Sequence, residues 1–438
     1  MLKNAIETSI FIVILCLSVW WCLKTDETPS TYLDLSKQTL VFPKNSYSPS
    51  PSFNLESIIY FDVPNSQAQA HASAIVNVSN VSDKDFMLLY FAGSREGARD
   101  VGIYQSFFTF ERDFKNERQI QSIDSNKIGH WSEPTLLLDA PMLSRLSGKF
   151  IKKLGNPITF VDMQGRVHLF VVGVSMGGWA TSKIYWLLLE STYQKDNTDS
   201  QKQGNQEHNL LSLHYIKELH LSPLLNFSHL VRTPALLKDD GGFILPIYHE
   251  LAHKYPLLLD FNSSLSLTSI LRPTQLKSQL QPSFVPLDKH SSVGIYRNHK
   301  AYENTLFVSE CGTICADAKP SNLKNYDSSS VLFNALDSIF LLHNQGREQG
   351  NRREELWIYK LLTQSLDEQE VHFSPIMRVD MLLNDEVSYP SVAESEDFVH
   401  IAYTYGRKYI RTALVPKSLL GDSTQFIESM QSLQKENK

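Results

Sequence analysis

The sequence predicts an all-β protein whose strands form a ring of small sheets, a β-propeller. The chain has 438 residues, of which 42% are hydrophobic and 11% aromatic, so it has enough apolar surface for a large core and favours strands. Short runs rich in Val, Ile, Phe and Tyr, such as "FMLLYFAG" and "RVHLFVVGV", recur between turn residues. Amphipathic helix patterns are nearly absent before the C-terminal tail, which further indicates an all-β fold.

Weak internal repeats favour the propeller within this class. Several units read as a proline, a strand, a polar turn and a second strand, and they begin at Pro157, Pro234, Pro282 and Pro390. A second motif, Ser followed by Pro and an apolar run, recurs at distances that fit units of roughly 45–50 residues, the length of a propeller blade. A closed ring of such sheets leaves no long edge strand exposed. The alternative is two stacked β-sandwich domains.

The N-terminal stretch differs from the rest of the chain. Residues 9–23, "SIFIVILCLSVWWCL", are apolar and lie between Lys3 and Lys24. This pattern predicts an uncleaved transmembrane signal anchor or a cleaved signal peptide, with a buried core helix as a third possibility. Both of the first two place the main domain outside the cytoplasm, in a periplasmic, extracellular or lumenal compartment.

The sequence divides into four segments. We expect the anchor or signal over residues 1–24, a polar linker over 25–54, the propeller over 55–415, and a tail over 416–438 that could end as a short helix. The polar stretch 195–209 is expected to be a disordered surface loop inside one blade.

Charge and cysteine content restrict which ligands the protein is expected to bind. The net charge is −6 without a long basic block, which argues against nucleic acid as a partner. Cys311 and Cys315 form "CGTIC" with no His or further Cys nearby, so zinc is a poor interpretation. A local disulfide and two free cysteines both remain open. We expect a monomer that needs no metal and no cofactor.

One short connection is unusually charged. "YFAGSREGARDVGIY", residues 90–104, places two arginines, a glutamate and an aspartate between two predicted strands. An ordinary solvated hairpin loop explains the pattern. A site for an anionic sugar explains it too, because an arginine fork binds carboxylates and a carboxyl group can act as a general acid.

This loop, the proline repeats and "VSYPSVAESEDFVHIAYTYGRKYIRTALV" together resemble the BNR-repeat, sialidase-like family of predicted neuraminidases. The resemblance runs from about residue 57 to 415. It implies a six-bladed β-propeller of sialidase type with a site at the centre of the ring, acting on acidic, sialic-acid-like glycans. It leaves open a catalytically inactive lectin for such glycans and an enzyme for another anionic polysaccharide.

The resemblance also implies catalytic roles. Arg95 would bind the substrate carboxylate and Asp100, five residues later, would be the acid/base. Tyr389 in "VSYPSV" would be the nucleophile, since sialidases use a tyrosine there. Gln281 stands where a glutamate would activate that tyrosine; it cannot be a base, so Glu250 is the expected substitute.

The remaining expected residues bind substrate. His71 stands in the region of the first arginine of the family, Arg297 matches the arginine of the fourth blade, and either Arg407 or Arg411 supplies the third. We further expect Trp179 to line the pocket, and Glu96 and Arg99 to stabilise their loop. Asp327 and Ser328 would bind a sugar hydroxyl or form an Asx turn.

Overall fold

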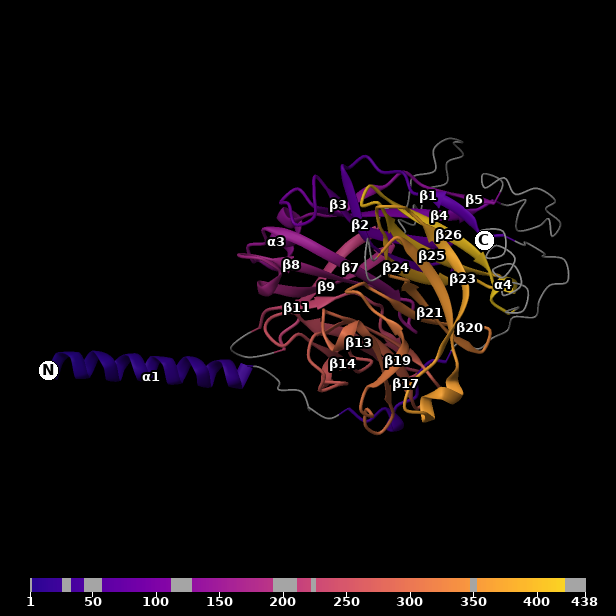
Figure 1. The fold of residues 1–438 in the computed structure, drawn as a ribbon. Coiled ribbons are helices and arrows are strands. Elements are labelled where there is room, and N and C mark those ends of the chain that lie inside the picture. The colour runs from indigo at the N-terminus through magenta and orange to yellow at the C-terminus, as the bar shows by residue number, and fades with distance from the viewer. Residues whose placement is uncertain are drawn as a thin grey trace, which may run out of the picture.

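The computed structural model describes residues 2–25, 33–42, 57–111, 128–191, 211–221, 226–346 and 353–421. Its strands form six antiparallel sheets arranged as a six-bladed β-propeller (Figure 1). The predicted all-β class and the six blades are therefore confirmed, and the β-sandwich alternative is wrong.

The first three sheets follow one another along the chain. The first contains β2 (Gln69–Asn77), β3 (Phe86–Gly93), β4 (Gly102–Phe110), β5 (Gly129–Trp131) and β6 (Thr135–Leu138). The second contains β7 (Lys153–Val161), β8 (Val167–Val174), β9 (Ser182–Ser191) and β10 (Leu211–Glu218). The third contains β11 (His229–Val231), β12 (Leu236–Leu237), β13 (Phe243–His249), β14 (Tyr255–Phe261) and β15 (Leu267–Leu271).

The other three sheets complete the ring. The fourth contains β16 (Gln279–Pro286), β17 (Ser292–Asn298), β18 (Thr305–Cys311) and β19 (Lys319–Lys324). The fifth contains β20 (Val331–Ala335), β21 (Ser338–Asn344), β22 (Glu355–Leu361) and β23 (Phe373–Met381). The sixth contains β24 (Val387–Glu394), β25 (Phe398–Tyr405), β26 (Tyr409–Pro416) and β1 (Ile59–Asp62).

Helices are few in the described residues. The α-helices are α1 (Leu2–Thr25), α3 (Ala140–Ser147) and α4 (Ser418–Gly421). The single-turn 3₁₀ segments are η1 (Leu35–Lys37), η3 (Trp179–Thr181), η4 (Tyr302–Asn304) and η5 (Thr363–Asp367). The predicted loop 195–209 and most of the predicted tail lie outside the described residues.

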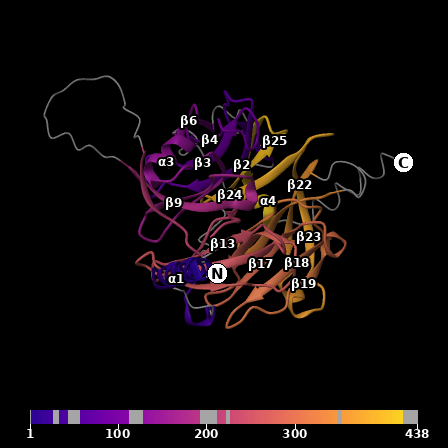
Figure 2. The ribbon, with the colours of Figure 1, turned by 90° about the vertical axis from the view of Figure 1, so that its left-hand side faces the viewer.

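The ring closes by pairing the two ends of the propeller. β1 is the outer strand of the sixth sheet and pairs antiparallel with β26, with Ile59 opposite Leu414 and Asp62 opposite Arg411. Figures 1 and 2 show the purple first sheet and the yellow sixth sheet side by side, although they are far apart in the chain. A propeller closed this way shares one sheet between its N- and C-terminal strands.

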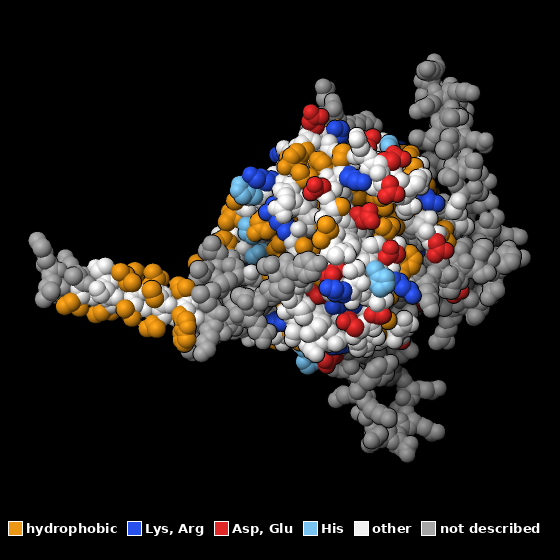
Figure 3. Space-filling model, turned by 90° about the horizontal axis from the view of Figure 1, so that it is seen from below, with side chains coloured by type: hydrophobic (Ala, Val, Ile, Leu, Met, Phe, Trp, Pro, Cys, Tyr) orange, Lys and Arg blue, Asp and Glu red, His pale blue; other side chains and the backbone are white. Residues whose placement is uncertain are grey.

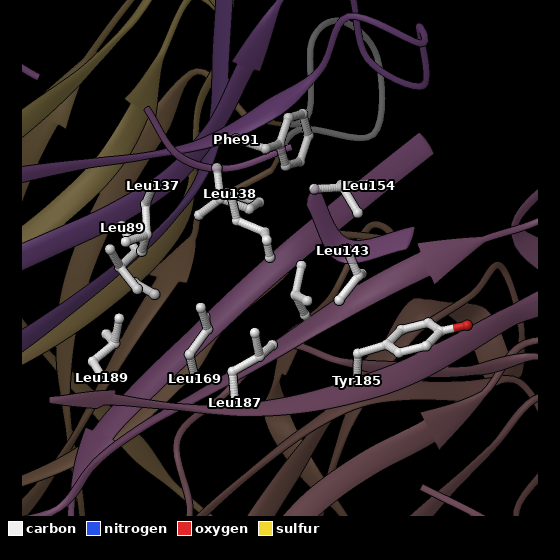
Figure 4. Close-up of a cluster of buried hydrophobic side chains, with 14 of the residues drawn as sticks. Leu89, Phe91, Leu137, Leu138, Leu143, Leu154, Leu169, Tyr185, Leu187 and Leu189 are labelled. Atoms are coloured by element: carbon white, nitrogen blue, oxygen red, sulfur yellow. The ribbon is translucent and has the colours of Figure 1, made fainter. Parts of the chain in front are cut away.

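The core lies between successive sheets. Figure 4 shows one such cluster between the first two blades, where Leu89 of β3 and Leu138 of β6 face Leu169 of β8 and Leu187 of β9. All four leucines are fully buried. Removing a leucine side chain of this kind from water contributes roughly 1.5–3 kcal/mol, so these interfaces hold the blades in fixed relative positions.

Four inner strands share a local irregularity that shapes the centre of the ring. The pairing register shifts in β2, β7, β16 and β24, which is the mark of a β-bulge. Pro157, Pro282 and Pro390 lie in or beside these bulges. Proline has no backbone N–H to contribute to a ladder and is tolerated at such positions. Three of the four predicted repeat prolines therefore mark inner-strand bulges, whereas Pro234 lies between β11 and β12.

The segment before the propeller departs from its prediction as a polar linker. Leu33, Leu35 and Leu40 are buried against the third and fourth sheets, in a cluster with Leu258 and Tyr296. The backbone of Leu40 bridges to Lys238. This part of the predicted linker therefore belongs to the folded domain, because its leucines cover apolar surface of the blades.

The apolar N-terminal stretch forms α1. Figure 3 shows its orange hydrophobic side chains along the helix, and Phe11, Ile14 and Leu17 are exposed. Among the residues that the structure describes, no helix is both long and apolar enough to cross a membrane. The anchor or signal role and the exported location stay predictions.

The cysteine pair of "CGTIC" is a disulfide. Cys311 and Cys315 are bonded, with their Cα atoms 3.9 Å apart. Cys311, the last residue of β18, is fully buried. Of the two possibilities that the sequence left open, the local disulfide is therefore the one found.

Candidate functional site

A cavity of about 230 Å³ opens at the centre of the ring. Its lining comes from all six sheets: Glu96, Asn156, Trp179, Leu230, Tyr248, Glu250, Gln281, Arg297, Arg353, Tyr389 and Arg407. Asn156, Gln281 and Tyr389 directly precede the bulge prolines of their inner strands. The bulges thus turn one side chain from each of these strands into the cavity.

Tyr389 is the central side chain of the cavity. Its backbone adopts φ 54°, a left-handed conformation that few tyrosines take. The Ser73 hydroxyl donates to the Tyr389 carbonyl oxygen at 3.0 Å and holds this turn against β2. Arg297 Nη1 donates to the Tyr389 hydroxyl at 3.0 Å. The phenol oxygen is therefore fixed in place and contacts a permanent cation.

Carboxylates on the outer side hold the cavity arginines. Arg297 Nε donates to Asp327 at 2.7 Å, and Arg353 Nη2 donates to the Asp327 carbonyl oxygen at 2.8 Å. Arg353 Nη1 also donates to Glu386 at 3.1 Å. These contacts fix both guanidinium planes before any ligand is bound.

The third arginine belongs to the sixth sheet. Arg407 Nε donates to Glu386, and Arg407 Nη1 donates to Glu96 at 2.5 Å. The Glu386 carboxylate therefore accepts hydrogen bonds from both Arg353 and Arg407 and holds the two side chains together. Three arginines from two sheets, the fourth and the sixth, and from the connection before β22 converge on one space.

The arginines change the acidity of Tyr389. Burial would raise the pKa of its phenol, but Arg297, Arg353 and a hydrogen bond from Gln281 lower it more, and the net shift is downward. At a given pH, Tyr389 therefore holds a larger phenolate fraction than an ordinary tyrosine, which makes it a better nucleophile.

Glu250 supplies a carboxyl group to the same cavity. It follows β13, its N–H donates to the Ser228 carbonyl oxygen at 3.0 Å, and its own carbonyl oxygen accepts from Lys254 at 2.7 Å. Within the described parts of the chain, no ion pair involves the Glu250 carboxylate, whereas Glu96 is paired with Arg407. Of the two cavity glutamates, Glu250 is therefore the one able to exchange a proton without breaking an ion pair.

Arg95 and Asp100 lie outside the cavity lining, which differs from the expectation. Both side chains are exposed. The Ser94 N–H and hydroxyl each donate to Asp100 at 2.9 Å, and they lower its pKa, whereas an acid catalyst needs a raised one. The loop closes on itself through these bonds, so Glu96 is the side chain of "GSREGARD" that faces the cavity.

His71 and Arg411 also lie elsewhere than expected. His71 is buried beneath Tyr389, with ring centroids 4.2 Å apart, and burial lowers its pKa well below the usual range. A neutral, covered imidazole does not bind an anion, so the anion-binding interpretation of His71 is corrected. Arg411, on β26, forms an ion pair with Asp62 at 2.6 Å and does not line the cavity. Arg407 is therefore the arginine of that pair that reaches the site.

The other expected residues are placed as follows. Gln281 is buried and its Nε2 donates to the Tyr248 hydroxyl at 3.4 Å. Trp179 lines the cavity; a side chain on Gly155 would come within 2.8 Å of its ring, so the ring packs directly on that glycine. Asp327 acts through Arg297, and Ser328 donates to Asn344 in the interior rather than to the cavity.

Sequence reasoning missed four lining residues, Arg353, Asn156, Tyr248 and Leu230. Asn156 directly precedes a repeated proline, as Gln281 and Tyr389 do, and that shared position would have indicated it. Arg353 follows a polar run without strand signals, and nothing in that run marks it. No group of three or more His, Cys, Asp or Glu able to hold a metal ion occurs among the residues that the structure describes.

Comparisons with known proteins agree with this architecture. The model of the BNR repeat-like domain family matches residues 84–401. No curated protein matches the chain at a significant level. Among solved structures, a protein of unknown function from Dyadobacter fermentans aligns with a TM-score of 0.54 at 9% identity, over 82% of this chain and 99% of the other.

Two sialidases of known structure are similar as well. A Hadza microbial sialidase aligns with a TM-score of 0.53 at 12% identity, over 80% of this chain and 66% of its own. The Trypanosoma rangeli sialidase in complex with the inhibitor DANA aligns with a TM-score of 0.51 at 12% identity, over 84% of this chain and 58% of its own. This chain thus spans less than two thirds of either sialidase, and at such identities the similarity establishes the fold.

Proposed function

The chain belongs to the BNR repeat-like domain family, and from that premise we propose that it is a glycoside hydrolase that removes a sialic-acid-like sugar from acidic glycans. The contact of Arg297 with the Tyr389 hydroxyl at 3.0 Å carries this proposal. It places a tyrosine of lowered pKa at the bottom of a cavity walled by arginines. An enzyme that hydrolyses an acidic glycoside needs both features, a nucleophile and positively charged side chains that bind the substrate carboxylate.

The arginines would bind the substrate carboxylate. A guanidinium group presents a planar fork that binds a carboxylate with two parallel hydrogen bonds. Arg297, Arg353 and Arg407 are already oriented by Asp327 and Glu386, so little side-chain entropy would be lost on binding. A neutral sugar would gain none of these charged contacts, and specificity for acidic glycans follows.

Tyr389 and Glu250 would carry out the reaction. Tyr389, having released its proton to solvent, bonds as the phenolate to the anomeric carbon, the glycosidic bond breaks, and protonated Glu250 gives its proton to the departing oxygen. Water then attacks the anomeric carbon, Glu250 takes a proton from that water, and the phenolate leaves. A tyrosine suits a substrate that carries its own carboxylate, because the phenolate charge is paired with Arg297, whereas an unpaired aspartate or glutamate would repel the substrate.

The test is hydrolysis by the full chain of a panel of fluorogenic aryl glycosides, acidic and neutral. We expect turnover of the sialoside and losses of about 10²–10⁴-fold with Tyr389→Phe and with Glu250→Gln. Tyr302→Phe and Glu303→Gln change exposed residues in the same chemical way and serve as controls. Turnover that survives Tyr389→Phe, or turnover confined to neutral glycosides, would overturn the proposal.

A lectin for acidic glycans is the second candidate. Two observations favour it: Asp100 lies outside the cavity lining, and Gln281, which cannot act as a base, lies beside Tyr389. A lectin would bind a sialylated glycan and leave it intact over the whole substrate panel. Its binding would fall with Arg297→Met and would be unchanged by Glu250→Gln, which separates it from the hydrolase.

A further inference from the structure

One buried arginine of the propeller axis has no place in the reaction as described. Arg232 follows β11 in the third sheet and is 2% exposed. Its Nε donates to the Ser329 hydroxyl at 3.1 Å, its Nη1 to the Ser73 carbonyl oxygen at 3.2 Å, and its Nη2 to the Pro390 carbonyl oxygen at 2.7 Å. One side chain thus joins the third sheet to the first, the sixth and the segment that leads into β20.

This guanidinium is buried without a counter-ion. No ion pair of Arg232 is present among the described residues, whereas buried Lys238 pairs with Asp260 at 2.7 Å and cavity Arg297 pairs with Asp327. A buried charge without a partner is costly, and hydrogen bonds to neutral oxygens offset only part of that cost. Burial accordingly lowers the pKa of Arg232 to about 10. A methionine of similar length would avoid the charge but would donate none of the three hydrogen bonds, so the charge itself is the feature to be explained.

Tyr389 is the group that this charge faces. The Arg232 Cζ atom lies 5.1 Å from the centroid of the Tyr389 ring, and Arg353 Cζ lies 5.7 Å from it. Arg232 also holds both chain segments that fix the tyrosine. It binds the carbonyl of Pro390, the next residue, and the carbonyl of Ser73, whose hydroxyl binds the Tyr389 carbonyl.

We propose that Arg232 is a positioning residue for Tyr389, which fixes the strained turn of the tyrosine and supplies a buried positive charge beneath its ring. The proposal rests on the function proposed above, in which Tyr389 reacts as a phenolate. When the phenol loses its proton, Arg297 contacts the oxygen and Arg232 adds a second positive charge near the ring, so the cost of the unpaired buried guanidinium falls at the same step. Arg232 touches no substrate and acts through Tyr389.

Several other groups act on the same phenol and must be held constant in a test. They are Arg297 at the hydroxyl, Arg353 at the ring face, His71 beneath the ring, Gln281, Glu96 and Tyr248. All of them lie on elements other than the one that carries Arg232, so each keeps its own side chain in the Arg232 variants.

The experiment is a titration of Tyr389 that does not depend on turnover. The ultraviolet absorbance of phenolate is measured against pH for the full chain and for Tyr389→Phe, and the difference between the two titrations belongs to Tyr389. The same pair of titrations is then measured with Arg232→Met and with Arg232→Lys added to both proteins. We expect the Tyr389 midpoint to rise by about one pH unit or more in Arg232→Met and to stay near the wild-type value in Arg232→Lys, which keeps the charge. The acid limb of kcat/KM should move by the same amount.

Control variants separate charge from scaffolding. Ser329→Ala removes one hydrogen bond of Arg232 and keeps its charge, so it should leave the Tyr389 midpoint unchanged while it lowers the melting temperature. A folded Arg232→Met protein with an unchanged midpoint overturns the proposal. Should Arg232→Met fail to fold, Arg232→Gln decides, because it can keep hydrogen bonds and removes the charge: a raised midpoint supports the proposal and an unchanged midpoint overturns it. A shifted midpoint in a protein without hydrolytic activity would sink the proposed function alone.

Discussion

Glu96 and Arg407 form an ion pair between the first and the sixth sheet, with Glu96 Oε2 2.5 Å from Arg407 Nη1. They are 311 positions apart in the chain, and both line the central cavity. The Glu96 carboxylate therefore occupies, in the free protein, a guanidinium edge that an acidic substrate could use. Both side chains are about one third exposed, so the pair is a weak one that a ligand can replace.

Replacing Glu96 by glutamine should strengthen substrate binding. Glu96→Gln removes the internal competitor for Arg407, and for an exposed pair worth up to about 1 kcal/mol we expect KM for an acidic glycoside to fall by up to roughly fivefold. Glu96 also raises the pKa of Tyr389, so the acid limb of kcat/KM should move to lower pH in the same variant. Glu133→Gln, an exposed change of the same kind in the first sheet, is the control. Steady-state kinetics decide the matter; a higher KM would mean that Glu96 itself binds the sugar.

The contact between Arg297 and Tyr389 predicts a pH profile. If the phenolate is the reactive form, kcat/KM rises with pH until Tyr389 is deprotonated, and Arg297 lowers the pKa at which that happens. Arg297→Lys keeps a charge but loses the fork, so it should shift the acid limb to higher pH by less than Arg297→Met does. Arg411→Met, which removes an equally well-paired arginine outside the cavity, should leave the profile in place. An unchanged acid limb in Arg297→Met would assign that limb to another group.

The sequence could predict the ring because its strands and prolines repeat locally. Strand patterns depend on neighbours in the chain, and the prolines mark bulges that recur in the inner strands at equivalent positions. Gln281 and Tyr389 were assigned through the family resemblance, and each directly precedes such a proline. The fold and this part of the cavity are thus encoded in short stretches of sequence.

The rest of the cavity depends on side-chain directions that spacing cannot supply. The five-residue spacing of Arg95 and Asp100 suggested a site, but Ser94 binds Asp100 and closes the loop, which leaves Glu96 facing the cavity. Arg353 reaches the cavity because Glu386 and the Asp327 carbonyl hold it there. The Ser94–Asp100 bonds lie within one loop, whereas the Arg353 contacts join residues 26 and 33 positions apart, and spacing records the direction of neither side chain.

The Cys311–Cys315 disulfide is expected to make a modest and local contribution to the stability of the folded state. Cys311 and Cys315 are four positions apart, and closing so short a loop stabilises the folded state by roughly 2 kcal/mol. Gly312 inside the loop accepts a hydrogen bond from the Leu35 N–H at 3.0 Å, so the loop also anchors the N-terminal segment 33–42. Cys311→Ala/Cys315→Ala should lower the free energy of unfolding by about that amount and speed amide exchange at Leu35. Equal exchange in both proteins would contradict the anchoring role.

His400 predicts how the propeller responds to acid. Its ring is fully buried in β25 and packs within 4.8 Å of Phe86 and 4.9 Å of Phe108, measured between ring centroids. Neither ring nitrogen has a hydrogen-bond partner among the described residues, and burial lowers its pKa from 6.5 to about 3. Between these two values the unfolded chain binds a proton that the folded chain does not. Stability is therefore complete above pH 6.5 and falls as the pH decreases, by about 1.4 kcal/mol per pH unit for this one group.

Removing the titrating group should remove that part of the acid sensitivity. His400→Phe keeps an aromatic ring among aromatic neighbours, and between pH 7.5 and pH 5 its free energy of unfolding should fall by about 2 kcal/mol less than that of the wild type. Overpacking could lower its stability at both pH values, and the comparison of differences cancels that effect. His130→Phe, the same change at an exposed position of β5, is the control variant. Urea unfolding at the two pH values measures both variants, and an equal loss in His400→Phe and wild type would show that His400 is already protonated in the folded protein.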